Sequence, residues 1–358
     1  IIRAINKSKT ANSNYTFLEI RGILKAEGVS SEKIVVTSKN DSDYGGTGSA
    51  SAGDWKNMVF TSTSSNSSLK YVVFRYGGAR EGLNQIEKEM VKIDGSSVEV
   101  ENVIMEKSLT RGLHIINYNS TIKDSIFRDS KVGVLIEGSP DSSTIENSSF
   151  ENNFEFGLQI IAGAAPIIKN NQFINNGIIG TDTKYSSQGA IAVYGAYPEF
   201  INNQAVNNLL NGILVHSKSI FDQDVVLQAD LPYIFSANSG DYITVGEGSV
   251  MTIESDAIIK SFSPHYTILL VRGTLVAQAA SGSEIVFTSL KDDTFGGDTN
   301  NDGNATIPSD NDWKNIKFTA ISKDSVLDYV FMYYGTGVPP IIIESGAGVE
   351  IKTIDYSP

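Results

Sequence analysis

The sequence predicts an all-β fold in which short strands coil into a right-handed parallel β-helix, a solenoid with inserted loops. Three observations predict it: a long repeat that occurs twice, a shorter repeat of about 23 residues within residues 98–216, and hydrophobic alternation of period two in each short repeat. A helical solenoid would show a period of 3.6 residues and longer units. At about 3.3 Å per strand residue, one short repeat makes a turn of three strands and their bends.

The long repeat begins at Tyr15, where YTFLEIRGILKAEGVSSEKIVVTS aligns with YTILLVRGTLVAQAASGSEIVFTS from Tyr266. The copies align again at Trp55 and Trp313, so the second intervening loop is seven residues longer. We interpret both tryptophans as anchors of these loops. Since both chain ends fall within a unit, we expect other domains in a longer chain, and we divide this one into residues 1–218 and 219–358.

The short repeat contains two stacked columns. A polar column contains Asn102, Asp124, Asn147, Asn170 and Asn202, and an apolar column three residues later contains Met105, Phe127, Phe150, Phe173 and Ala205. A buried asparagine can bond backbone groups at a bend and the asparagine one turn away. We therefore predict that the polar column is a buried ladder and that the apolar column belongs to the core.

These columns resemble the asparagine and phenylalanine ladders of pectate-lyase-like right-handed β-helix repeats. The flanking GEGSVMTIESDAIIKSF, GGDTNNDG and DWKNIKF segments resemble long β-helix segments of bacterial secreted and surface-anchored proteins. The resemblance implies the fold, an extracellular location on the bacterial cell surface and an adhesive role. It implies no catalytic residues, because that group is diverse in activity.

Alternation after each repeat's glycine or alanine separates two faces. The inward positions are Leu113, Ile115, Val134, Ile136, Leu158, Ile160, Ile191, Val193, Ile213 and Val215, all aliphatic. The outward positions are His114, Leu135, Gln159, Ala192, Leu214, Ile116, Glu137, Ile161, Tyr194 and His216. Such an apolar outer face is either covered by an inserted segment, from AREGLNQIEKEM or GTDTKYSSQ, or suited to stacking on sugar rings. The sugar-binding alternative names Leu135, Ile161, Tyr194, Tyr197, Leu214 and His216.

The longer second loop carries GGDTNNDG, which places Asp298, Asn300 and Asp302 at positions 1, 3 and 5 of a calcium loop. Position 12 is Ser309 instead of a bidentate glutamate, with Asp310 adjacent. The expected Ca²⁺ ligands are Asp298, Asn300, Asp302 and Asp310. The alternative is a solvated turn, since these residue types also form turns without an ion.

Composition excludes several classes of function. The formal net charge of −13 argues against nucleic acid and disfavours polyanionic glycans. Without cysteine, the chain has no disulfide, thiolate metal site or cysteine nucleophile. No apolar run is long enough to insert into a membrane.

The sequence offers few combinations of residues that could be catalytic. A lyase would draw on Arg111, His114 and Lys131 beside Glu137, and a hydrolase on Glu137 with Asp141. We therefore expect no catalytic residues, and a non-catalytic segment that binds polysaccharide, a neutral glycan such as cellulose, through a flat sheet face. The alternatives are a β-helix polysaccharide lyase or glycoside hydrolase, and a purely structural stalk.

Overall fold

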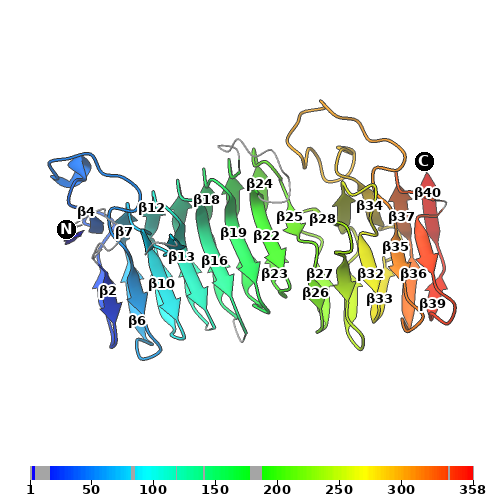
Figure 1. The fold of residues 1–358 in the computed structure, drawn as a ribbon, viewed down its shortest axis with the longest axis horizontal. Coiled ribbons are helices and arrows are strands. Elements are labelled where there is room, and N and C mark those ends of the chain that lie inside the picture. Colours follow the sequence, from blue (N-terminus) through cyan, green and yellow to red (C-terminus); the bar gives the residue numbers. More distant parts are fainter. Residues whose placement is uncertain are drawn as a thin grey trace. The chain divides into compact units, whose positions relative to one another are not determined.

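The computed structural model describes residues 2–4, 17–81, 85–117, 119–139, 142–177, 188–337 and 339–357. These residues form short strands and one 3₁₀ helix, η1 (Ser42–Tyr44). The chain divides into two compact units, unit 1 with residues 1–190 and 202–208, and unit 2 with residues 191–201 and 209–358. Each unit is a right-handed parallel β-helix, which confirms the predicted fold class (Figure 1). No helix in the described ranges has the length and apolar character needed to cross a membrane.

Unit 1 stacks its strands into three parallel sheets. Sheet A contains β1 (Ile2–Ala4), β4 (Ile34–Ser38), β7 (Val72–Arg75), β12 (Ile104–Glu106), β15 (Ile126–Arg128), β18 (Ser149–Glu151), β21 (Gln172–Ile174) and β24 (Gln204–Val206). Sheet B contains β2 (Leu18–Ile20), β5 (Met58–Phe60), β10 (Val91–Asp94), β13 (Arg111–Ile116), β16 (Val132–Glu137) and β19 (Phe156–Ile161). Sheet C contains β3 (Lys25–Glu27), β6 (Ser67–Lys70), β11 (Val98–Glu101), β14 (Thr121–Lys123), β17 (Thr144–Glu146) and β20 (Ile167–Lys169). An antiparallel hairpin of β8 (Arg80–Glu81) and β9 (Ile86–Glu87) is inserted before β10.

Unit 2 also has three parallel sheets, together with β23 (Glu199–Ile201). Sheet D contains β22 (Gly189–Tyr194), β25 (Ile213–Val215), β28 (Tyr233–Phe235), β31 (Ile258–Ser261), β34 (Ile285–Ser289), β37 (Val330–Tyr333) and β40 (Ile354–Ser357). Sheet E contains β26 (Ile220–Phe221), β29 (Ile243–Val245), β32 (Leu269–Val271), β35 (Ile316–Phe318) and β38 (Ile341–Ile343). Sheet F contains β27 (Val225–Leu227), β30 (Val250–Ile253), β33 (Thr274–Gln278), β36 (Ser325–Asp328) and β39 (Val349–Ile351).

The interior of the coil matches the alternation in the sequence. All ten aliphatic positions predicted to face inward are buried, and Phe127, Phe150 and Phe173 are completely buried. The ring centroids of Phe127 and Phe150 lie 5.3 Å apart, and those of Phe150 and Phe173 lie 4.6 Å apart with nearly parallel planes. Stacked rings one turn apart therefore form the continuous core that the phenylalanine column predicts.

The polar column has a different role from the one predicted. Its five members adopt left-handed backbone conformations, with φ between 51° and 54°, and they are half-buried or exposed. Asparagine and aspartate tolerate this conformation better than other residues with side chains, so they occupy the bend itself. One predicted contact is present, since Asn202 Nδ2 donates to Asn170 Oδ1 over 2.8 Å at the surface.

The buried ladders lie one residue later in each turn. Each ladder side chain accepts a hydrogen bond from the backbone N–H of the corresponding residue one turn earlier, over 2.8 to 3.2 Å, and the two ladders begin with the backbone donors of Val103 and Ser108. The ladder between sheets C and A contains Ser125, Ser148, Asn171 and Asn203, and the ladder between sheets A and B contains Ser130, Asn153, Asn176 and Asn208. The side chains thereby satisfy backbone donors that strand pairing cannot reach.

Replacing a ladder asparagine is expected to destabilise unit 1. Asn176 Oδ1 accepts from both the backbone nitrogen and Nδ2 of Asn153, over 3.1 and 2.9 Å. Asn176→Ala leaves these buried donors unpaired, so the free energy of unfolding should fall by about 2–3 kcal/mol in urea titrations. The control Asn175→Gly changes the adjacent left-handed residue and should stay within about 0.5 kcal/mol of the original chain. Equal effects of the two substitutions would contradict the ladder assignment.

Candidate functional site

Both tryptophans anchor their loops in the same way. Trp55 Nε1 donates to the carbonyl of Arg75, and Trp313 Nε1 donates to the carbonyl of Tyr333, over 2.7 Å in each copy. Both rings are buried. Since a buried indole needs a partner for its N–H, this bond fixes the ring and the start of the following strand. The predicted anchoring role agrees with these contacts.

A second pair of bonds is also common to the copies. Thr37 Oγ1 donates to Asp41 Oδ2, and Thr288 Oγ1 donates to Asp292 Oδ2, over 2.6 Å in each case. Both aspartates are buried. The two loops therefore start from one framework, and they differ in what balances the buried carboxylate.

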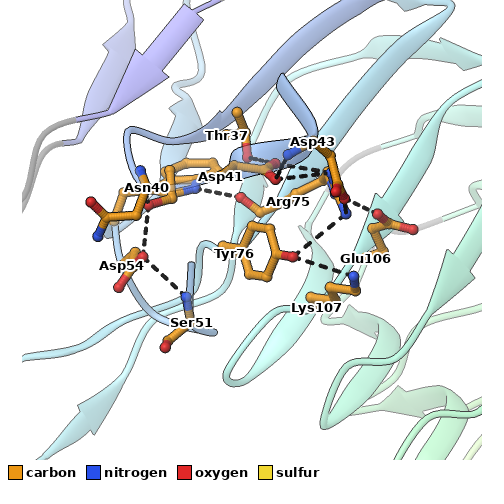
Figure 2. A network of polar contacts seen from close by, with 12 residues as sticks. Thr37, Asn40, Asp41, Asp43, Ser51, Asp54, Arg75, Tyr76, Glu106 and Lys107 are labelled. Atoms are coloured by element: carbon orange, nitrogen blue, oxygen red, sulfur yellow. Dashed lines mark hydrogen bonds and ion pairs between the residues drawn. The ribbon is translucent and has the colours of Figure 1, made fainter. Parts of the chain in front are cut away.

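In the first copy, the side chain of Arg75 supplies the balancing charge (Figure 2). Its guanidinium contacts Asp41 Oδ2 at 2.9 Å, Asp43 Oδ2 at 2.8 Å and Glu106 Oε1 at 2.6 Å. The hydrogen bond from Arg75 lowers the pKa of Asp43. These carboxylates are held by a cation of the chain itself, so the network serves to fold the loop.

In the second copy, Tyr333 occupies the position of Arg75, and the buried cation is Lys260. Its Nζ donates to the carbonyl oxygens of Asp292 and Gly297, over 2.8 and 2.9 Å. Burial lowers the pKa of Lys260 to about 8. The sequence analysis did not identify Lys260 as a functional residue. The one indication in the sequence is that Lys260 occupies an outward position in the β31 segment IIKS.

The acidic loop between β34 and β35 brings together some of the predicted Ca²⁺ ligands. Carboxylate oxygens of Asp293, Asp298 and Asp302 lie within 4.8 Å of one another. The Asn300 side chain is buried and contacts Asp302, while Asp310 is not a member of this carboxylate group. Burial, followed by the nearby Asp298 charge, raises the pKa of Asp293. The motif thus identified three of the four groups that gather here.

The predicted sugar-binding residues divide by exposure. Leu135 and Leu214 are buried, so neither presents a surface to a ligand in this conformation. Ile161 and His216 are half-buried, and Tyr194 is 43% exposed. In unit 2, the Tyr194 and His216 rings meet edge to face with centroids 6.3 Å apart.

Tyr197 is partly exposed, and its hydroxyl is hydrogen-bonded to the Asp222 carboxylate and accepts from the Asp222 backbone nitrogen over 3.1 Å. Burial, followed by the Asp222 hydrogen bond, raises the pKa of Tyr197 to about 12. The ring is therefore held as a neutral phenol at the surface of unit 2, and its hydroxyl already has partners.

The acidic loop explains why Leu214 is buried. Leu214 is in register with Ile234, which is in register with Lys260, so the three side chains share the outer face of sheet D. Asn211 binds the loop through its backbone nitrogen to Thr299 O at 2.8 Å and through Nδ2 to Asp298 O at 3.0 Å. Of the two explanations for the apolar face, these neighbouring contacts favour cover by an inserted segment at Leu214, and they point to the acidic loop instead of the two segments expected.

The β8–β9 hairpin brings carboxylates to the basic residues of sheet B. Glu87 contacts Lys131 Nζ at 2.8 Å and Arg111 at 3.7 Å. His114 lies between two further carboxylates, Glu89 at 3.5 Å and Glu137 at 3.0 Å. The basic residues considered for a lyase, Arg111, His114 and Lys131, thus lie on one face, and each is next to a carboxylate. Asp141, the second hydrolase candidate, and residues 180–187 of the GTDTKYSSQ insertion lie outside the described residues.

The outer face of sheet B contains a cavity of about 230 Å³. It is lined by Phe17, Glu19, Lys56, Asn57, Val59, Lys88, Glu89 and Lys92. Three of these, Glu19, Val59 and Lys92, are in register with one another and with His114, so the cavity lies along a column of outward positions. The sequence analysis did not predict this site, because it listed the outward positions only from His114 toward the C-terminus.

Each lysine around this cavity contacts a carboxylate. Lys56 and Lys88 share Glu81, at 2.7 and 3.4 Å, and Lys92 contacts Asp94 at 2.7 Å. Phe17 remains 54% exposed, with Lys56 Nζ 5.1 Å from its ring centroid. The cavity therefore offers an open aromatic face and many hydrogen-bonding groups, and each of its three lysines contacts a carboxylate.

A larger cavity of about 460 Å³ also lies in unit 1. Its lining residues are Ala52, Arg80, Ser108, Leu109, Asp129, Ser130, Lys131, Asn152 and Phe154. Phe154 is 42% exposed. This cavity lies at the bend between sheets A and B, where the ladder residues Ser108 and Ser130 form part of its wall.

One comparison with known proteins supports the fold. Residues 57–226 match the family model described as a right-handed β-helix region. No curated protein matches the chain in sequence. The A-module of a mannuronan C-5 epimerase from Azotobacter vinelandii is 12% identical, with 96% of this chain and 83% of that chain covered and a TM-score of 0.31.

Two further solved structures are similar at the same distant level. The Agl-KA catalytic domain is 11% identical over 94% of this chain and 62% of its own, with a TM-score of 0.28. The catalytic domain of a GH87 α-1,3-glucanase, solved with tetrasaccharides, is 10% identical over 95% of this chain and 62% of its own, with a TM-score of 0.23. Similarities this distant indicate no activity. Residues 57–226 are a right-handed β-helix region, and the strands on either side of them repeat the same coil.

Glu89→Gln is expected to reveal how far the hairpin depends on charge. Burial disfavours the Glu89 carboxylate, but the interactions with the His114 ring, 3.5 Å away, and with its own backbone N–H outweigh burial, so the pKa of Glu89 is lowered. A lowered acid pKa stabilises the fold above the ordinary value of about 4.3, and this contribution is lost as pH falls. The variant should lose about 1–3 kcal/mol of unfolding free energy at pH 7, and the difference should shrink below about pH 4.

The matched control for that experiment is Glu137→Gln. The Glu137 side chain is 39% exposed, so its pair with His114 is screened by water. Its substitution should change the free energy of unfolding by less than about 1 kcal/mol. A Glu89 effect that persists unchanged at acid pH would show that charge is not its cause.

Proposed function

We propose that this chain is a non-catalytic polysaccharide-binding segment of an extracellular bacterial surface protein. The observation that carries the proposal is the cavity on the outer face of sheet B, where exposed Phe17 stands among paired charges. Sugar rings present apolar faces that stack on aromatic side chains, and their hydroxyls bond carboxylates, amides and ammonium groups. The extracellular surface location is an expectation from the sequence resemblance.

The charges in the cavity favour a neutral glycan such as cellulose. Lys56, Lys88 and Lys92 each contact a carboxylate, so a polyanion would have to break these pairs before it gained new ones. A neutral chain can accept hydrogen bonds from the same ammonium groups without separating the charges. The net charge of −13 acts in the same direction, since it repels a polyanion at long range.

The aromatic pair of Tyr194 and His216 in unit 2 is a second proposed contact. Tyr194 retains an exposed ring, and half-buried Ile161 in unit 1 and partly exposed Tyr197 in unit 2 are the other predicted contacts that remain accessible. Burial lowers the pKa of His216, so its imidazole is neutral at pH 7 and adds no charge to the surface. Leu135 and Leu214 are omitted from the proposed surface because both are buried.

Affinity electrophoresis against soluble neutral and acidic glycans, with pull-down on cellulose, tests the proposal. Phe17→Ala should weaken binding by about fivefold to tenfold, which corresponds to about 1 kcal/mol of lost stacking. Tyr194→Ala should have a smaller effect if unit 2 adds a second contact. Phe154→Ala, which removes an exposed aromatic from the larger cavity, is the matched control and should retain full binding.

The same samples separate the alternatives. Loss of binding in Phe154→Ala with none in Phe17→Ala would assign the site to the larger cavity. Release of unsaturated uronates or of new reducing ends by the original chain would make it a lyase or a hydrolase. Absence of binding to every glycan, with no product, would leave the structural stalk as the better account.

A further inference from the structure

Three carboxylates converge in the loop that joins β34 to β35. Oxygens of Asp293, Asp298 and Asp302 lie within 4.8 Å of one another. Like charges at this separation repel, and the repulsion is stronger where water is partly excluded. Carboxylate oxygens in such a group are the ligands that Ca²⁺ prefers, because it is a hard cation that takes six to eight oxygens.

A buried amide beside this group has an acceptor without a donor. Asn300 is 5% exposed, and its Nδ2 donates to Asp302 Oδ2 at 2.8 Å and to Thr306 Oγ1 at 3.1 Å, so the amide reaches into the carboxylate group. Within the described ranges, Asn300 Oδ1 and Asp293 Oδ1 are buried without a hydrogen-bond partner. A buried acceptor without a donor costs about 1–3 kcal/mol, and coordination to a cation is one way to remove that cost.

The nearby lysine does not contact these carboxylates directly. Lys260 Nζ donates to two backbone carbonyls, those of Asp292 and Gly297, and no ion pair joins it to a carboxylate in the part of the chain that the structure describes. In the first copy, by contrast, Arg75 contacts its carboxylates directly. The second copy thus has the same loop framework, more carboxylates and no guanidinium.

We propose that Asp293, Asp298, Asp302 and the Oδ1 atom of Asn300 bind one Ca²⁺ ion. Because Asn211 ties the same loop to the strand that carries Leu214, binding would also fix the loop over the outer face of sheet D. This site does not depend on glycan binding, which is assigned to other residues.

Calorimetric titration of the whole chain with Ca²⁺, after removal of metal by chelation, tests the site. One ion should bind, with a dissociation constant of about 10⁻³ M or lower. Asp293→Asn should weaken binding at least tenfold, although the motif in the sequence does not include this residue. Asp310→Asn is the matched control and should leave affinity unchanged, since Asp310 lies outside the carboxylate group.

Two results would overturn the proposal. One is the absence of both binding heat and any rise in melting temperature up to about 10 mM Ca²⁺. The other is a loss of affinity in Asp310→Asn with none in Asp293→Asn, which would replace the proposed ligands by those of the motif.

Thermal unfolding gives a second readout that does not depend on calorimetry. Without metal, Asp293→Asn should melt at or above the temperature of the original chain, because it removes one of three repelling charges. With Ca²⁺ the order should reverse, since only the original chain gains stability from the ion. An unchanged order in Ca²⁺ would contradict the assignment of Asp293 as a ligand.

Discussion

The structure of unit 1 depends on how the backbone donors at its bends are satisfied. Strand pairing satisfies the sheets, but each bend buries N–H groups that no strand can reach. Serine and asparagine side chains from the next turn accept those hydrogen bonds, and each is preceded by a left-handed residue that makes the bend. Because the bends recur at fixed places, strand length and register follow, and the phenylalanine rings stack one above another.

The coil interior was predictable because its signal is local and periodic. Alternation located all ten inward side chains, and the spacing of Phe127, Phe150 and Phe173 located the ring stack. The predicted ladder position was wrong by one residue, because pairs such as Asn170 and Asn171 put two asparagines at the same bend. Only backbone conformation distinguishes the left-handed asparagine from the buried one.

The candidate sites were less predictable because they depend on the paths of inserted loops. Periodicity identified Leu214 as outward, but no pattern showed that a loop about 80 residues later would cover it. Asp293 lies outside the calcium-like motif and joins the carboxylates only when the loop closes. The tryptophan anchors were the exception, since two copies of one feature indicated a shared role.

The ladders also give the coil a direction. Each side-chain oxygen of the ladders belongs to the later turn, and the backbone N–H that it accepts from belongs to the earlier one, so each turn is completed by the turn made after it. A chain emerging from the ribosome therefore always carries its incomplete turn at the growing end. A cut across the ladders would expose backbone donors on one face and side-chain acceptors on the other, so two such coils could be joined only head to tail.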